Sequence, residues 1–150
     1  MTPLHYYQQQ LASGLIEKDP QQLEVMHDLQ RIYTQLLKRE SARQQFLAQL
    51  VRTIKPSNPV KGLYLWGSVG VGKTFMMDIF FHCLPINKLR LHFHQFMQRT
   101  HDELTRLQGQ KNPLDIFAKK LAKETKILCF DEFFVSNIAD AMILGGLLKP

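Results

Sequence analysis

The chain has 150 residues, 45% of them hydrophobic, and a formal net charge of +6 at pH 7. This length suffices for one α/β domain with its own core, beside which we expect a helical extension rather than a second full domain. The basic residues are spread along the chain, so the charge by itself identifies no anionic partner. Cys83 and Cys129 lie in apolar stretches without metal-ligand spacing, so we expect buried thiols in a reducing compartment instead of a disulfide framework.

The amino-terminal residues have neither a basic region nor a following apolar run, so they do not resemble a secretory leader. No later stretch approaches the ~18 apolar residues that a membrane span needs. We therefore expect a soluble, cytoplasmic protein.

The first third of the chain predicts helices. Apolar residues recur at spacings of three and four from Leu23 to Leu37, which is typical of an amphipathic helix. Asp19 and Pro20 supply a cap and a first-turn proline for that helix. A further apolar cluster at 46–51 predicts that the helical pattern continues or restarts.

A turn-rich stretch then separates these helices from an alternation of strands and helices. We predict a helical extension over 1–54, a linker over 55–61 and a nucleotide-binding domain over 62–150. Apolar or alternating runs predict strands at 62–66, 89–94 and 127–130, and helical spacing predicts helices at 73–84, 96–107 and 114–123. This order predicts an α/β fold with a parallel sheet flanked by helices.

A glycine-rich loop of the pattern GxxxxGK[ST] lies between the first predicted strand and helix, where a phosphate-binding loop belongs. Its residues are Gly67, Ser68, Val69, Gly70, Val71, Gly72, Lys73 and Thr74. The glycines allow backbone N–H groups to turn toward phosphates, and the helix start adds its positive dipole end. We predict that Lys73 contacts the β and γ phosphates of ATP and that Thr74 ligates Mg²⁺. The alternative is a tight strand-to-helix turn without a ligand.

Two carboxylates follow the apolar strand at 127–130. In enzymes with a phosphate loop, a second strand delivers an aspartate to Mg²⁺, and a neighbouring glutamate often orients the attacking water. We predict these roles for Asp131 and Glu132, so that Glu132 and Lys73 are the catalytic residues. An ordinary strand followed by a solvated turn is the alternative.

Several other features have a structural interpretation beside a functional one. His92 and His94 could share one strand face and bind a metal, but we favour polar strand or helix-entry positions because further ligands are not evident. Phe133 and Phe134 lie at the sheet edge where ligands usually bind, although one of them can be core. Gln22 could approach an adenine edge, and we favour a solvated helix position.

Five strings in the chain are more specific than the phosphate loop. They are KGLYLWG at 61–67, LHFHQFM at 91–97, LQGQ at 107–110, LCFDEFFVS at 128–136 and DAM at 140–142. With them the chain resembles the ZapE-type AAA+ ATPases. The resemblance implies ATP hydrolysis in the cytoplasm, coupled to cell division through the tubulin-like ring protein FtsZ, with homo-oligomers and peripheral association with the inner membrane.

The chain departs from this family in two ways. Ser68 and Val71 stand where the family usually has Gly and Arg, which places any family role of that arginine in doubt. Family members also continue past Pro150 with a strand that carries a polar sensor residue and with an arginine that completes a neighbour's site. In the family's strand order the further strand lies between 62–66 and 127–130, so we expect a truncated chain with an incomplete sheet.

The sequence therefore predicts a P-loop AAA+ ATPase that uses ATP and Mg²⁺. Two rivals stay open. A nucleic-acid-linked ATPase similar to helicase loaders would use the positive charge on a phosphate backbone, although it is not favoured. A nucleotide-gated adaptor would bind ATP without hydrolysing it.

Overall fold

The protein divides into two compact units. A computed structural model describes residues 1–49 and 59–148. The units are Met1–Pro85 and Ile86–Pro150. Residues 55–58 of the predicted linker lie outside the described residues, so the division at 54 and 61 stays a prediction.

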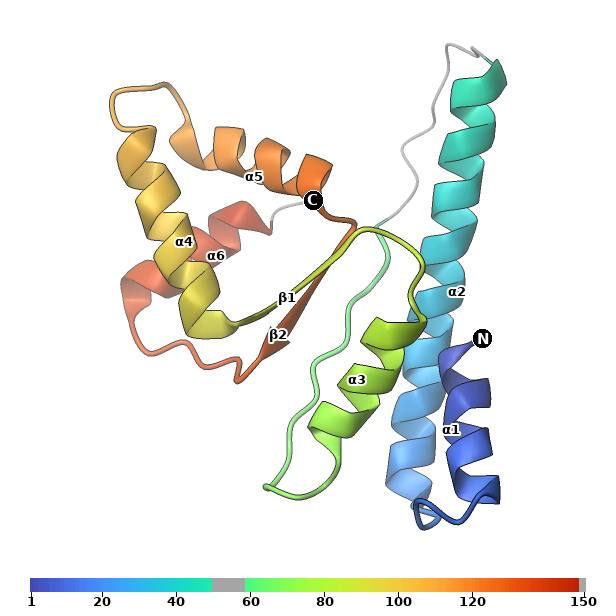
Figure 1. The fold of residues 1–150 in the computed structure, drawn as a ribbon. Coiled ribbons are helices and arrows are strands. Elements are labelled where there is room, and N and C mark those ends of the chain that lie inside the picture. Colours follow the sequence, from blue (N-terminus) through green and yellow to red (C-terminus); the bar gives the residue numbers. More distant parts are fainter. Residues whose placement is uncertain (50–58, 149–150) are drawn as a thin grey trace. The chain divides into compact units, whose positions relative to one another are not determined.

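The described part of the first unit contains three helices that contact one another: α1 (Pro3–Ala12), α2 (Pro20–Gln49) and α3 (Lys73–Cys83) (Figure 1). Asp19 caps α2 as predicted, because its Oδ1 accepts hydrogen bonds from the backbone N–H groups of Gln21 at 2.8 Å and Gln22 at 3.3 Å. The helical pattern continues through residue 41 without a break.

The buried face of α2 is the one that its apolar spacing predicts. The buried hydrophobic side chains of the first unit are Tyr7, Met26, Leu29, Ile32, Tyr33, Met76, Ile79, Phe80 and Leu84. The opposite side of α2 is polar and exposed. Among the described residues, no helix combines the length and the apolar character that a membrane crossing requires.

The strand predicted at 62–66 is not formed. Residues 61–68 have no regular secondary structure, and the side chains of Tyr64 and Trp66 are 64% and 83% exposed. A strand needs a neighbouring strand to complete its ladder of hydrogen bonds. The family resemblance places another strand between this segment and the strand at 127–130, and residues 1–49 and 59–148 contain no such strand. The apolar run alone therefore does not make a strand.

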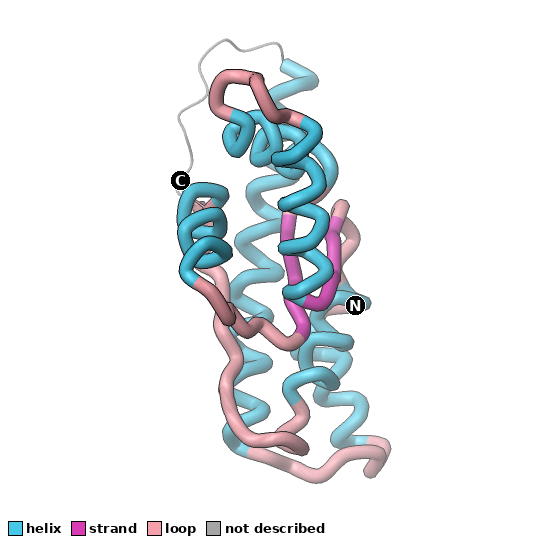
Figure 2. Tube along the Cα trace, turned by 90° about the vertical axis from the view of Figure 1, so that its left-hand side faces the viewer, coloured by secondary structure: helices cyan, strands magenta, loops and turns pink. Residues whose placement is uncertain are grey.

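The second unit contains a two-stranded parallel sheet and three helices (Figures 1 and 2). In chain order its elements are β1 (Lys88–His92), α4 (Phe93–Arg106), α5 (Pro113–Glu124), β2 (Ile127–Asp131) and α6 (Ile138–Leu147). β1 and β2 pair in parallel from Lys88↔Ile127 to His92↔Asp131. The predicted α/β class and the parallel sheet are confirmed, and two strands among the described residues are consistent with a partial P-loop AAA+ domain.

The two faces of this sheet differ in character because side chains alternate along a strand. Leu89 and Leu91 of β1 pair with Leu128 and Phe130 of β2, and these four pack against the core of the unit. That core comes from α4, α5 and α6 and consists of Phe93, Phe96, Met97, Phe117, Leu121, Leu144 and Leu147. Arg90 and Asp131 belong to the other face.

The boundaries of two elements differ from the prediction. β1 ends at His92, where its pairing with β2 ends, and α4 begins at Phe93 rather than at residue 96. His94 therefore lies in the first turn of a helix and not on the strand. α6 was not predicted; the side chain of Asn137 caps it by accepting a hydrogen bond from the backbone N–H of Asp140 at 2.8 Å.

The core of the second unit gives a stability prediction. Phe96 is 0% exposed, so we expect Phe96→Ala to lower the free energy of unfolding by about 3–5 kcal/mol through lost burial and a cavity. Phe134 is 76% exposed, so Phe134→Ala should change the free energy of unfolding by no more than about 0.5 kcal/mol. Urea unfolding followed by circular dichroism measures both variants. Equal losses in the two would contradict the assigned core.

Candidate functional site

The phosphate loop turns sharply into α3. Gly70 and Gly72 have φ angles of 89° and 83°, a left-handed conformation that side chains with a Cβ adopt at a cost. Gly72 is the cap residue of α3, so the loop ends where the first unpaired N–H groups of the helix begin. Backbone N–H groups and the positive helix end both favour an anion at this position.

Lys73 lies over the loop that precedes it. Its Nζ donates hydrogen bonds to the backbone carbonyls of Gly67 at 2.8 Å and Ser68 at 2.7 Å. These contacts place a positive charge at the loop. Val69 is fully exposed and Thr74, the next residue of α3, is also exposed, so solvent reaches this loop. The arrangement is suited to an anionic ligand that arrives from solution.

Gln22 of α2 contacts the same loop. Its Nε2 donates to the backbone carbonyl of Val71 at 3.4 Å, and its Oε1 accepts from the hydroxyl of Tyr7 at 3.4 Å. The favoured interpretation of Gln22 as a solvated helix position is therefore wrong. The sequence could not reveal this contact, because 49 residues separate Gln22 from Val71.

The predicted acidic pair lies at the carboxyl end of β2. Asp131 is the last residue of the strand, and its carboxylate accepts two hydrogen bonds from Arg90 of β1, at 2.7 Å from Nε and 3.0 Å from Nη2. The two side chains are 20% and 24% exposed. Such a bidentate ion pair fixes the plane of the carboxylate. Sequence reasoning missed Arg90, although a cation between Leu89 and Leu91 was a visible signal.

Glu132 has an unusual backbone. Its φ angle is +50°, which costs a residue other than glycine about 1–2 kcal/mol. Its side chain is 81% exposed, and Oε2 lies 3.8 Å from Nδ1 of His92 at the end of β1. The strained turn directs the chain away from the strand directly after Asp131. Backbone strain of this kind is often found at functional positions.

The predicted magnesium ligands are Thr74 in the first unit and Asp131 in the second. Mg²⁺ prefers oxygen ligands, and Thr74 and Asp131 would supply a hydroxyl and a carboxylate. Both carboxylate oxygens of Asp131 contact Arg90, so a cation would compete with that guanidinium. The described residues contain no cluster of three or more His, Cys, Asp or Glu that could hold a metal. The rings of His92 and His94 lie 6.0 Å apart, one on a strand and one on a helix.

The neighbours of the acidic pair have structural roles. Phe133 packs against Phe93 with ring centroids 4.6 Å apart, whereas Phe134 is exposed. One of the two aromatic residues is thus core, and the other is not. Cys129 is buried as predicted, and burial raises the pKa of its thiol to about 11. Cys83 is only half-buried.

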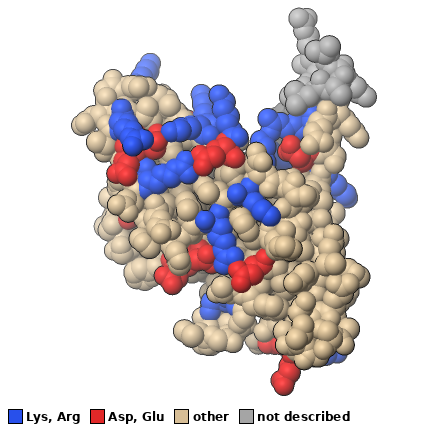
Figure 3. All heavy atoms as spheres, in the orientation of Figure 1, with Lys and Arg blue, Asp and Glu red and all other residues tan. Residues whose placement is uncertain are grey.

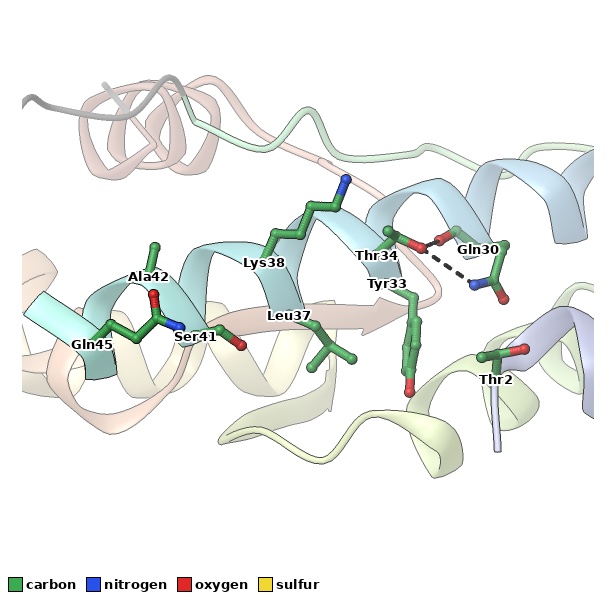
Figure 4. Close-up of a pocket in the computed structure, with 9 residues that line it drawn as sticks. All are labelled: Thr2, Gln30, Tyr33, Thr34, Leu37, Lys38, Ser41, Ala42 and Gln45. Atoms are coloured by element: carbon green, nitrogen blue, oxygen red, sulfur yellow. Dashed lines mark hydrogen bonds between the residues drawn. The ribbon is translucent and has the colours of Figure 1, made fainter.

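A pocket of about 420 Å³ lies along α2 (Figure 4). It is lined by Thr2, Gln30, Tyr33, Thr34, Leu37, Lys38, Ser41, Ala42 and Gln45, and Gln30 and Thr34 are joined there by hydrogen bonds. None of these lining residues belongs to the predicted site. The pocket therefore does not mark the phosphate loop.

The sequence-predicted residues thus form two groups. Gly67 to Thr74 form one continuous turn into α3 in the first unit, and Asp131 and Glu132 are adjacent at the end of β2 in the second unit. The loop leads into α3 and the two carboxylates follow β2, in the places where the sequence puts them. The roles themselves, ATP binding by the loop, Mg²⁺ binding by Thr74 and Asp131 and catalysis by Glu132 and Lys73, stay predictions.

A glycine loop that leads into a helix, together with carboxylates at the end of a parallel strand, defines part of a P-loop nucleotide-binding protein. A model of the AFG1-like ATPase family matches residues 1–150, so the chain belongs to this family.

Named relatives extend this result. The cell division protein ZapE of Escherichia coli (strain K12) is 46% identical over 158 residues, covering 99% of this chain and 42% of that protein. An uncharacterized protein of Schizosaccharomyces pombe is 33% identical over 180 residues, covering 99% and 40%. Lactation elevated protein 1 homolog B of Danio rerio is 38% identical over 104 residues, covering 61% and 21%. The chain thus spans about two fifths or less of the length of these relatives. No solved structure matches it significantly.

The Arg90–Asp131 pair gives a prediction for the site. Arg90→Met removes the partner of the Asp131 carboxylate, which is largely shielded from water. We therefore expect the free energy of unfolding to fall by about 1–3 kcal/mol. Arg106→Met is the matched control. Arg106 pairs with Glu103 at 3.4 Å but is 76% exposed, so its loss should cost less than about 1 kcal/mol. Urea unfolding measures both. An equal, small loss in the two variants would show that the pair adds no stability.

Proposed function

We propose that the protein binds Mg·ATP on residues 67–74 and hydrolyses it. The observation that carries this proposal is the position of Lys73, whose ammonium lies over the loop carbonyls at the start of α3. A mobile cation beside a row of backbone N–H groups is suited to a triphosphate. Membership in the AFG1-like ATPase family supports the same proposal.

Each predicted residue has a defined part in the proposed reaction. The loop amides and Lys73 hold the phosphates, while Thr74 and Asp131 hold Mg²⁺, which when bound neutralises charge on the β and γ phosphates. Because Arg90 contacts both oxygens of Asp131, Mg²⁺ would have to take over at least one of these oxygens from the guanidinium. Glu132 accepts a hydrogen bond from water and directs it at the γ phosphate, for which its exposed carboxylate is available.

We further propose that ATP turnover serves cell division in the cytoplasm. This part rests on the E. coli relative, which is named a cell division protein, and on the resemblance described above. The partner would be an FtsZ-type ring protein, with the protein acting as a homo-oligomer and associating peripherally with the membrane. An oligomer would let one subunit supply an arginine to its neighbour's site.

The charge distribution gives less support to a nucleic-acid partner. Basic and acidic side chains are interspersed on the face of the protein in Figure 3. In the second unit, Lys120 pairs with Glu103 at 2.8 Å, and Arg99 pairs with Glu124. Cations that already have carboxylate partners contribute little to binding a phosphate backbone, which needs uncompensated charge.

Two substitutions separate binding from hydrolysis. Lys73→Ala should weaken Mg·ATP binding at least about tenfold, because the charge over the loop is lost. Glu132→Gln keeps the shape of the side chain but removes the base, so ATP affinity should stay within about twofold while turnover falls about 100-fold. Calorimetric titration of the 150-residue chain measures binding. Phosphate release by the complete protein translated from the gene measures turnover.

Glu103→Gln is the control for the second substitution, because Glu103 is a carboxylate on α4 that pairs with Lys120. It should leave both affinity and turnover unchanged. Absence of Mg·ATP binding by the unaltered chain would overturn the proposal. Unchanged turnover in Glu132→Gln would remove only Glu132 from its role.

The partner can be tested with purified components. We expect the complete protein to cosediment with FtsZ polymers more strongly with ATP than with ADP. Bound ATP would favour the conformation that binds the partner. Single-stranded DNA at physiological salt should neither bind nor raise turnover. DNA binding that weakens with salt and stimulates ATP hydrolysis would instead support the nucleic-acid-linked alternative.

A further inference from the structure

A side-chain contact joins the amino-terminal helices to the phosphate loop. Gln22 lies in the first turn of α2, and its amide nitrogen donates to the backbone carbonyl of Val71, inside the loop. The side chain is half-buried rather than solvated. Ordering a long glutamine side chain costs conformational entropy, which the contacts with Val71 and Tyr7 have to offset.

The contact continues into α1 through Tyr7. This residue is 0% exposed, and its hydroxyl donates to Oε1 of Gln22 at 3.4 Å. Burial raises the pKa of Tyr7, so the hydroxyl keeps its proton and stays a donor. The oxygen and the nitrogen of the Gln22 amide thus have different partners, which fixes which way round the amide lies.

The loop leaves space for this amide. A Cβ at Gly72 would lie 2.8 Å from Nε2 of Gln22, closer than two such atoms can pack. The φ angle of Gly72 is 83°, a conformation that glycine adopts readily. Glycine at this position suits the turn, and a Cβ here would require the end of the Gln22 side chain to move away.

The orientation of the peptide group between Val71 and Gly72 determines where the N–H of Gly72 points. In a trans peptide the C=O and the following N–H point in opposite directions. A hydrogen bond that holds the Val71 carbonyl toward Gln22 therefore directs the N–H of Gly72 away from it. Backbone N–H groups in such a loop are the donors that cradle phosphate, so their directions decide how well the loop is prepared for its ligand.

We propose that Gln22 is a positioning residue for the phosphate loop, and that through Gln22 and Tyr7 the helices α1 and α2 set the affinity for Mg·ATP. This inference deepens the proposed function and rests on it. The amino-terminal helices are then more than a packing support, because a displacement of α1 or α2 changes the direction of a loop amide. A ligand or partner bound to these helices would alter nucleotide affinity by the same route.

The test removes the amide and keeps the bulk. Gln22→Met preserves the length of the side chain and its helix propensity but can neither donate to Val71 nor accept from Tyr7. We expect its dissociation constant for Mg·ATP to rise about threefold to tenfold, as the loss of a neutral hydrogen bond predicts. Tyr7→Phe removes the hydroxyl that donates to Gln22, and it should raise the dissociation constant for Mg·ATP about twofold.

Gln21→Met is the matched control, because Gln21 is the exposed neighbour of the same residue type on the same helix. Its dissociation constant should equal that of the unaltered chain. Calorimetric titration with Mg·ATP is run on the 150-residue chain at a temperature at which thermal unfolding shows every variant to be folded. A purely structural role of Gln22 predicts a lower Tm with an unchanged dissociation constant.

The outcomes separate this inference from the proposed function. If the unaltered chain binds Mg·ATP and Gln22→Met binds it equally well, the inference is overturned and the proposed function stands. If the unaltered chain does not bind Mg·ATP, both are overturned. A weakening in Gln22→Met that Gln21→Met does not share supports the inference.

Discussion

The parallel pairing of β1 with β2 is the constraint on which the second unit depends. Because side chains alternate along a strand, the register that sends Leu91 and Phe130 into the helical core also places Arg90 and Asp131 together on the other face. A slip of one residue would exchange the faces and direct the charge of Arg90 into apolar surroundings. One register therefore specifies both the core and the pairing of the predicted magnesium ligand.

In the first unit, contacts with helices have the corresponding role. A loop that binds phosphate must hold several N–H groups in one direction, although a glycine-rich segment has little tendency to do so alone. The start of α3 fixes one end of the loop, and Lys73 closes over the other through the carbonyls of Gly67 and Ser68. Gln22 adds a contact from α2 to the middle of this turn. Contacts from the helices thus reach both ends and the middle of the loop.

In both units the sequence predicted some elements correctly and others wrongly. The amphipathic spacing of α2, the cap at Asp19 and the strand ending at Asp131 are local patterns, and the structure confirms each of them. The strand at 62–66 was wrong because an apolar run forms a strand only beside another strand. The end of the strand predicted at 89–94 was wrong because two-residue alternation over six residues does not show where pairing ends, whereas the favoured interpretation of His92 and His94 as polar strand or helix-entry positions is confirmed.

The sequence by itself determined the family and predicted the residues that would hold a triphosphate, since the GxxxxGK[ST] pattern and the strings around Asp131 each consist of consecutive residues. It also determined the helical and parallel-strand character, through periodicity and the order of elements. Only the tertiary structure decided that Arg90 pairs with Asp131 and that Gln22 contacts the loop. These contacts join residues 41 and 49 positions apart, and no local pattern encodes which distant side chains meet when a chain packs.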